Sequence, residues 1–161
     1  EDGRFKMTPP LRSAEDRAAL IEGVMDGTIE VIATDHAPHS AEEKSRGLEG
    51  SAFGIVGLET AFALMYTNFV AAGRMSLEPL LELMSAAPRR IFGLGGGIAV
   101  GERADLAVFD LDEEYVIDPA EFLSKGHSTP FEGWRVKGKC LLTVSRGKVA
   151  YADRKLEEHK F

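Results

Sequence analysis

The stretch TIEVIATDHAPHS, residues 28–40, constrains the fold of this chain more than any other part of its sequence. Its first seven residues are rich in β-branched side chains, as expected for a strand that is covered on both faces in a parallel sheet. Asp35 follows directly, and His36 and His39 lie in the polar segment after it. Parallel α/β sheets and barrels carry their reactive side chains at the carboxyl ends of their strands. The sequence therefore predicts a functional carboxylate at such an end.

Helical patterns lie on both sides of this predicted strand. Residues 12–27 and 57–73 each predict an amphipathic helix, and a third helix begins at Ser76 and is interrupted by Pro88. The buried face of the first helix is expected to hold Leu20, Ile21 and Val24, and that of the second Leu58, Phe62, Met65 and Phe69. Helix, strand, long loop and two further helices indicate an α/β fold.

The pattern changes after the glycine cluster at residues 93–97. Short strands separated by turn residues replace the helices, and they are predicted at residues 104–112, 115–118, 135–145 and 147–151. The glycine cluster does not fit the phosphate-binding pattern G-x-G-x-x-G, because Ile98 occupies its last position. The sequence therefore predicts two segments, an α/β segment over residues 1–95 and a β-rich segment over residues 96–161.

Charge and cysteine content exclude several classes of protein. A formal charge of −7 and a pI near 5.1 argue against nucleic-acid or anionic membrane partners, which would repel an acidic surface. No window approaches the roughly 18 continuous apolar residues of a membrane span. A single cysteine, Cys140, rules out a disulfide framework, and its apolar neighbours predict a buried thiol in a reducing, cytoplasmic compartment.

Asp35 is the best candidate for chemistry from the residues alone. A carboxylate at a strand end suits a hard or borderline metal and can also move a proton, and His39 could orient a substrate or bind its anion. The alternative is that Asp35 caps the following loop and that both histidines are exposed. A catalytic zinc site needs about three protein ligands. His127 and His159 lie too far along the chain, so a complete zinc site is not expected here.

A hydrolase triad is not supported by the sequence. Ser51, Ser128 and Cys140 have no base nearby in the sequence that could activate them as nucleophiles. The residues alone therefore indicate no nucleophilic mechanism, and both readings of Asp35, as a metal ligand and as a loop cap, stay open.

Six segments, taken in order, resemble dihydroorotase, in its bacterial, zinc-dependent, long-chain type within the amidohydrolase superfamily. They are KMTPPLR (6–12), IATDHAPHS (32–40), FGIVGLETA (53–61), SAAPRRIFGL (85–94), ADLAVFDLD (104–112) and FLSKGHSTPFEGWRVKGKCLLTVSRGKVAY (122–151). The resemblance implies the C-terminal part of a TIM-like (β/α)8 barrel followed by part of a β-sandwich. It also implies reversible cyclisation of N-carbamoyl-L-aspartate to dihydroorotate in pyrimidine biosynthesis.

The resemblance assigns roles to five residues. Asp35 resembles the metal-binding aspartate at the end of the eighth barrel strand, which also acts as general base and acid. His39 resembles the ligand of the substrate carboxylate, and the backbone of Phe53 and Gly54 resembles the pair that holds the substrate ring. Thr8 departs from the family pattern, because many relatives carry asparagine there and its amide contacts substrate. A threonine hydroxyl cannot present the paired donor and acceptor of an amide.

The resemblance also implies cofactors and partners. Two zinc ions belong to the complete enzyme, and their other ligands would precede residue 1, so this chain alone is expected to be inactive and to bind zinc weakly or not at all. The expected partners are a small-molecule substrate, the missing N-terminal part of the same enzyme, and further copies in a homo-oligomer.

Two alternatives stay open. One is another cyclic amidohydrolase, such as a hydantoinase, dihydropyrimidinase or allantoinase. The other is a non-catalytic dihydroorotase-like subunit that serves as a scaffold for aspartate transcarbamoylase, and Thr8 is the only feature that favours it.

Overall fold

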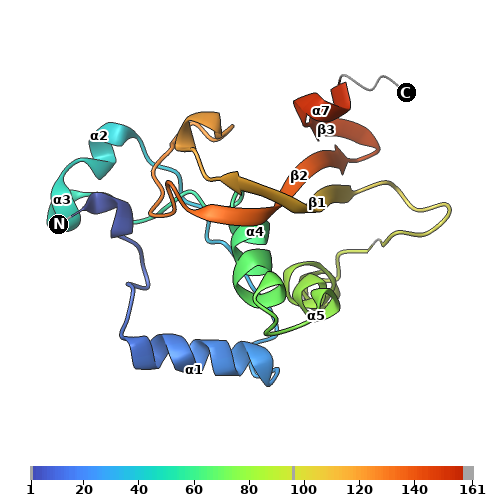
Figure 1. Ribbon diagram of the computed structural model, residues 1–161, viewed down its shortest axis with the longest axis horizontal. Coiled ribbons are helices and arrows are strands. Elements are labelled where there is room, and N and C mark those ends of the chain that lie inside the picture. Colours follow the sequence, from blue (N-terminus) through green and yellow to red (C-terminus); the bar gives the residue numbers. More distant parts are fainter. Residues whose placement is uncertain (1, 96, 158–161) are drawn as a thin grey trace.

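The computed structural model describes residues 2–95 and 97–157 as a set of helices packed against one small sheet (Figure 1). The helical elements are η1 (Gly3–Phe5), α1 (Ala14–Met25), α2 (Ala41–Lys44), α3 (Gly47–Gly50), α4 (Ala61–Met65), the π-helix η2 (Tyr66–Ala71), α5 (Leu77–Leu81), the π-helix η3 (Glu82–Ala86), α6 (Ala87–Ile91), η4 (Pro119–Glu121) and α7 (Arg154–Glu157). The strands are β1 (Leu106–Val116), β2 (Arg135–Ser145) and β3 (Lys148–Ala152). His159 lies outside the described residues.

The three strands form an antiparallel sheet in the order β1-β2-β3. The predicted strands over residues 104–112 and 115–118 merge into the single strand β1, because two register shifts let it stay paired with β2 along its length. Arg146 and Gly147 join β2 to β3 with φ of 53° and 75°. Two successive positive φ angles are typical of the tight turn that matches the twist of a hairpin.

Helix α4 and the sheet share one hydrophobic core. Ala63 and Leu64 of α4 pack against Ile117 and Val136, and all four side chains are buried. Beside them, a Cβ atom at Gly138 would lie 3.1 Å from the ring of Phe62. Glycine at this position therefore lets the helix approach the sheet closely, and the helical and β-rich segments pack together rather than standing apart.

The second and third predicted helices are present, with differences in detail. Helix α4 runs directly into η2, and Phe69 is buried as expected, whereas Leu58 lies before the helix and is 64% exposed. The third helical region continues through Pro88 to Ile91, so the expected interruption at Pro88 is wrong. Pro88 lies in the first turn of α6, just after the widened turn η3, where a missing N–H group is tolerated.

The predicted strand over residues 28–34 is wrong for this structure. Within the described residues no strand is assigned there, and a single backbone bond, from Ile32 N–H to the Leu83 carbonyl at 3.0 Å, ties the segment to η3. A strand exists through hydrogen bonds to its neighbours, and a parallel sheet needs partners beside it. The described residues supply no such partner strand, although the apolar run has the right composition.

Helix α1 has the predicted ends but lacks the predicted buried face. Ser13 and Asp16 form a capping box at its start, and Gly27 follows it with φ of 84°. None of its residues is buried, and Leu20 is 59% exposed. Ile21 and Val24, the other two residues of the expected face, are half-buried, and Figure 1 shows α1 at the lower edge of the molecule, away from the sheet.

Two further expectations are settled by burial and helix length. Cys140 is half-buried rather than buried, with its sulfur 3.7 Å from the Leu142 carbonyl. In residues 2–95 and 97–157, none of the helices has both the length and the apolar character needed to cross a membrane.

Candidate functional site

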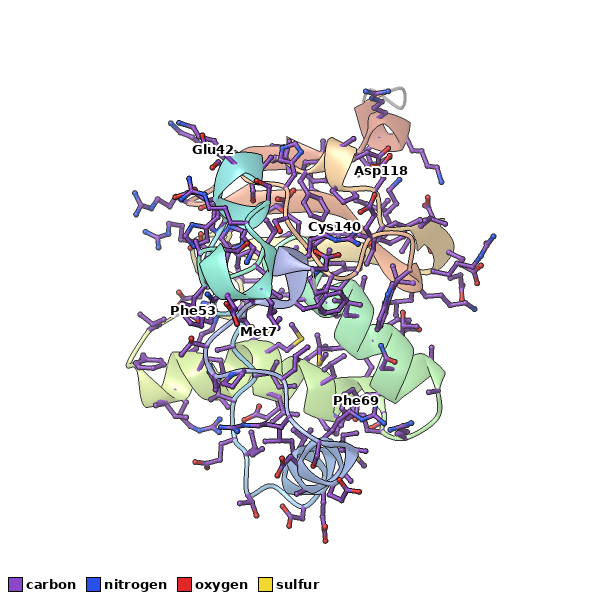
Figure 2. All side chains as sticks on the ribbon, turned by 90° about the vertical axis from the view of Figure 1, so that its left-hand side faces the viewer. Met7, Glu42, Phe53, Phe69, Asp118 and Cys140 are labelled. Carbon is purple, nitrogen blue, oxygen red and sulfur yellow. The ribbon has the colours of Figure 1, made fainter. Side chains whose placement is uncertain are left out.

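Three chain segments meet around a cavity of about 240 Å3, which we call the Asp35 cavity. The residues that line it are Met7, Thr8, Pro9, Thr34, Asp35, Ala37, Phe53, Gly54 and Ile55. Figure 2 shows Met7 and Phe53 close to each other at this edge of the molecule. Four of the five residues that the sequence singled out, Thr8, Asp35, Phe53 and Gly54, therefore line the same cavity.

A larger cavity of about 360 Å3 lies between α4 and the sheet. It is lined by aromatic and aliphatic side chains such as Phe62, Phe109 and Tyr115, and none of the five predicted residues contributes to it. Size alone therefore does not identify the site, and the gathering of chemically capable residues favours the smaller Asp35 cavity.

Asp35 has an unusual backbone. Its φ of 44° lies in the left-handed region, which few residues other than glycine adopt and where aspartate and asparagine are several-fold enriched. The side chain is exposed and lines the cavity. The backbone after it is held by a bond from Ala37 N–H to the Ile55 carbonyl at 3.0 Å. Strained backbone of this kind clusters at functional sites.

His36 is bound on the side away from the cavity. Its Nδ1 accepts hydrogen bonds from the backbone N–H groups of Gly57 and Leu58, at 3.1 Å and 3.2 Å. The ring proton must therefore lie on Nε2, which is 3.4 Å from the hydroxyl of Ser124. That hydroxyl donates to the carboxylate of Glu59 at 2.6 Å. His36 thus fixes the chain next to Asp35 and does not line the cavity.

His39 lies one contact behind the cavity wall. Its Nε2 is 2.8 Å from the carbonyl oxygen of Phe53, and its Nδ1 is 3.6 Å from the carboxylate of Glu43. The backbone of His39 is also covered, because a Cβ atom at Gly126 would lie 2.4 Å from its carbonyl oxygen. Both histidines are half-buried, so the alternative in which they are merely exposed is wrong.

Gly54 is required by the close approach of its neighbours. Its φ is 129°, and a Cβ atom there would lie 2.5 Å from the Cβ of Ala37. Its N–H donates to the Lys6 carbonyl at 3.0 Å, so this donor is already used. The Phe53 carbonyl, which accepts from His39, keeps a second lone pair that a ligand can use.

Lys44 was missed by sequence reasoning. It is only 5% exposed, and its ammonium group donates to the carbonyl oxygens of Lys6, Ala52 and Gly54 at 3.0, 2.8 and 2.8 Å. Burial lowers the pKa of Lys44, and the nearby charge of Lys6 lowers it further. A lysine in the polar stretch AEEKSRG has the sequence pattern of a solvated residue. The pairing of Ser40 with Glu43 signals the start of a helix there but not that Lys44 faces inward.

The described residues do not form a metal centre by themselves. Within residues 2–95 and 97–157, no group of three or more histidine, cysteine, aspartate or glutamate side chains could hold an ion. Asp35 is the one side chain of these types that lines the cavity, and it can supply a single ligand. His127 is exposed and lies against Phe122, with 6.3 Å between the ring centroids. It takes no part in the site.

Comparison with known proteins shows which family this architecture belongs to. The model of the amidohydrolase family matches residues 7–150, which is most of the chain. The chain belongs to the amidohydrolase family. This family assignment confirms the expected fold class, the C-terminal part of a (β/α)8 barrel followed by part of a β-sandwich. In the described residues this part appears as helices and one small antiparallel sheet.

Curated relatives within the amidohydrolase family support the resemblance found in the sequence. Dihydroorotases of Bacillus thuringiensis (strain Al Hakam) and Bacillus cereus (strain B4264) are each 53% identical to this chain over 151 residues. The match covers 93% of this chain and 35% of each relative, so the chain spans about a third of their length. The resemblance to dihydroorotase is therefore confirmed for this part of the relatives' sequence.

Solved amidohydrolase structures share the fold. The L-hydantoinase (dihydropyrimidinase) of Arthrobacter aurescens is 38% identical with a TM-score of 0.84, over 93% of this chain and 35% of that one. A D-hydantoinase (dihydropyrimidinase) from a Thermus species is 30% identical with a TM-score of 0.84, over 94% of this chain and 34% of that one. The arrangement of the described elements is thus that of the corresponding region in these enzymes.

Proposed function

We propose that this chain supplies the Asp35 part of a dihydroorotase active site, which opens and closes the ring of dihydroorotate. The observation that carries the proposal is the Asp35 cavity, where a strained aspartate meets Thr8, Phe53 and Gly54 from two other segments. The identity of 53% to curated dihydroorotases supports the choice of substrate.

In the proposed reaction, Asp35 is the residue that moves the proton. Ring opening adds water across the C–N bond of a cyclic amide, so one proton leaves the attacking water and one must reach the departing nitrogen. A single carboxylate beside the substrate can accept the first and deliver it to the second. The reverse sequence closes the ring of N-carbamoyl-L-aspartate and releases water. The exposed carboxylate of Asp35 on the cavity wall is suited to this exchange.

The other four residues are proposed to bind substrate. His39 is the proposed partner of the substrate carboxylate. The backbone carbonyls of Phe53 and Gly54, each with a lone pair not used by His39 or Lys44, are proposed to hold the ring. Thr8 lines the same cavity and has one hydroxyl to offer. Zinc, as two ions in the complete enzyme, is the proposed metal, with Asp35 as one ligand and the rest on polypeptide outside the described residues.

A hybrid enzyme tests the proposal. In it, this chain replaces the matching region of the Bacillus cereus (strain B4264) dihydroorotase, which provides the remaining two thirds of the fold. We expect the hybrid to hydrolyse dihydroorotate and this chain alone, with zinc, to be inactive. Clear turnover by the chain alone would refute the divided site, and an inactive but folded hybrid would refute the proposed function.

A different cyclic amide is the second candidate substrate. The observation that favours it is the structural match to hydantoinases, with TM-scores of 0.84. An uncharged hydantoin lacks the carboxylate that a cationic or donor group would bind. Comparing the hybrid's kcat/KM for dihydroorotate and for hydantoin separates the two candidates.

Scaffolding and self-association are further proposals. Thr8 lies at the cavity wall, where the family resemblance predicts asparagine. This departure favours a subunit that has lost tight substrate binding and instead supports aspartate transcarbamoylase. Replacing Thr8 by asparagine in the hybrid enzyme tests the scaffold hypothesis. A strong gain in activity would support the scaffold, and little change would support an enzyme that works with threonine. We also propose that the chain forms a homo-oligomer.

A further inference from the structure

We infer that Lys44 is a positioning residue of the candidate site, which ties together the two segments that form one wall of the Asp35 cavity. The tie itself is independent of the chemistry, whereas its effect on substrate binding rests on the proposed function. Lys44 does not line the cavity, so it acts through the residues that do.

All three N–H donors of the Lys44 ammonium group are used in hydrogen bonds. An ammonium group has three N–H donors and no acceptor, and Lys44 meets three backbone carbonyls within 3.0 Å. A buried cation is costly unless its donors are matched, because the lost hydration must be replaced. With a side chain that is 5% exposed, Lys44 has replaced water by these carbonyls. The site is therefore built around the lysine and is not a chance contact.

The carbonyl groups that Lys44 binds belong to the two segments that form this wall. Ala52 and Gly54 flank Phe53, so the two bonds fix the peptide on either side of a residue that lines the cavity. Lys6 immediately precedes Met7 and Thr8, which line the cavity from the other segment. Lys44 therefore sets the distance between the two parts of this wall.

Further contacts join the same two segments. The Gly54 N–H donates to the Lys6 carbonyl at 3.0 Å, and the Lys6 ammonium lies 4.4 Å from the centre of the Phe53 ring. Gly3 packs tightly over the last turn of α2, since a Cβ atom there would lie 2.3 Å from the Lys44 carbonyl. In Figure 1, η1 accordingly lies beside α3, at the same end of the molecule as α2.

The segments tied by Lys44 carry proposed substrate-binding residues, whereas the proposed proton carrier, Asp35, lies on another segment. Asp35 belongs to a third segment, whose bonds to the Phe53 segment begin at Ile55, after the last residue that Lys44 contacts. Ala37 donates to the Ile55 carbonyl, and His36 accepts from Gly57. Loss of the Lys44 bonds should therefore loosen the substrate-binding wall more than it disturbs the carboxylate. We expect weaker substrate binding with a smaller change in the proton-transfer step.

Hydrogen exchange on this chain tests the tie directly. Lys44→Met keeps the length of the side chain and removes its donors, Lys44→Arg keeps the charge, and Lys148→Met on exposed β3 is the matched control. We expect the Gly54 amide to exchange about tenfold faster in Lys44→Met, to change less in Lys44→Arg, and to be unchanged in Lys148→Met. The Gly133 amide, bonded to the Ile117 carbonyl at the shared core, should not respond.

Two exchange results would overturn the inference. One is unchanged protection of the Gly54 amide in Lys44→Met. The other is equal acceleration of the Gly54 and Gly133 amides, which would show that Lys44 contributes only to global stability.

Kinetics of the hybrid enzyme test the consequence. For Lys44→Met we expect KM for dihydroorotate to rise about tenfold with a smaller change in kcat, and partial rescue in Lys44→Arg. A fall in kcat at constant KM would overturn the positioning role. An inactive hybrid carrying the unaltered chain would count against the proposed function alone, because the exchange experiment decides the tie without any turnover.

Discussion

The Nε2–H of His39 donates a hydrogen bond of 2.8 Å to the carbonyl oxygen of Phe53. A carbonyl can only accept, so Nε2 is the donor in this contact, and Nδ1 lies 3.6 Å from the carboxylate of Glu43. The proposed ligand of the substrate carboxylate and the wall of the Asp35 cavity are thus linked in the structure. Substitution of His39 should therefore change the position of the Phe53 backbone as well as the binding of the substrate.

Replacing His39 by alanine in the hybrid enzyme should raise KM for dihydroorotate by about tenfold, because the Phe53 carbonyl loses its donor and the substrate carboxylate loses its proposed partner. The rise for an uncharged hydantoin should be clearly smaller. The measurement is KM for both substrates, with His39→Gln as a control that keeps a side-chain N–H. Equal effects on both substrates would favour the hydantoinase alternative.

Replacing Asp35 by asparagine should lower kcat of the hybrid by roughly a hundred- to ten-thousand-fold, the usual contribution of a general base and acid. Asparagine tolerates a positive φ nearly as well as aspartate, so the backbone at 44° should persist. Steady-state turnover and a thermal melt of the same preparation check both parts. Near-normal turnover in Asp35→Asn would exclude Asp35 as the proton carrier.

Replacing Gly126 by alanine should destabilise the chain by about 1–3 kcal/mol and displace His39, because the added Cβ would lie 2.4 Å from its carbonyl oxygen. Gly95→Ala is the matched control, since a Cβ atom there would meet nothing within 4 Å. Urea unfolding measures the free energy of both variants. Equal stability of the two would show that the contact at His39 relaxes without cost.

Replacing Asp153 by asparagine should destabilise the chain by about 1 kcal/mol at pH 7. The N–H of Lys155 and then the charge of Lys139 lower the pKa of Asp153 below 3.8. The carboxylate's contribution is therefore complete above pH 3.8 and is lost as the pH falls through the lower, folded-state value. Unfolding free energies of the two proteins should converge in that acidic range.

The exposed Asp112 provides the control for that comparison, as Asp112→Asn. A difference between native protein and Asp153→Asn that stayed constant down to the acidic range would mean that packing, and not charge, explains the loss.

Self-association is expected from the exposed apolar side of α1, because apolar surface left in water favours contact with another copy. Leu20 is 59% exposed and Met25 is 45% exposed. Light scattering should find species larger than a monomer, and Leu20→Glu should shift the distribution toward the monomer. A single monomeric species before any substitution would contradict the prediction.

Residues with local signals were predictable from the sequence. Asp35 follows an apolar run and Ser13 caps a helix, and both signals are contained within a few positions of the chain. Gly54 was singled out by the family resemblance, and its close approach to Ala37 is visible only in the structure. The gathering of Thr8, Asp35, Phe53 and Gly54 in one cavity was suggested by the family resemblance and not by spacing.

Features that depend on contacts with residues far along the chain, or outside it, could not be predicted from local sequence patterns. The run over residues 28–34 has the composition of a strand, but hydrogen-bonded neighbours decide whether a strand forms, and the described residues offer none. The apolar side of α1 likewise needs a surface to cover it. Lys44 was missed because its acceptors are carbonyls, which every residue carries and no sequence pattern marks.

The contact between Gly126 and His39 has a practical consequence for anyone redesigning this protein. The segment between η4 and β2 packs at Gly126 against the backbone of His39, so added bulk in that segment would move the histidine while every residue that lines the Asp35 cavity keeps its identity. If His39 binds substrate as proposed, selectivity could therefore be changed from this segment as well as from the cavity.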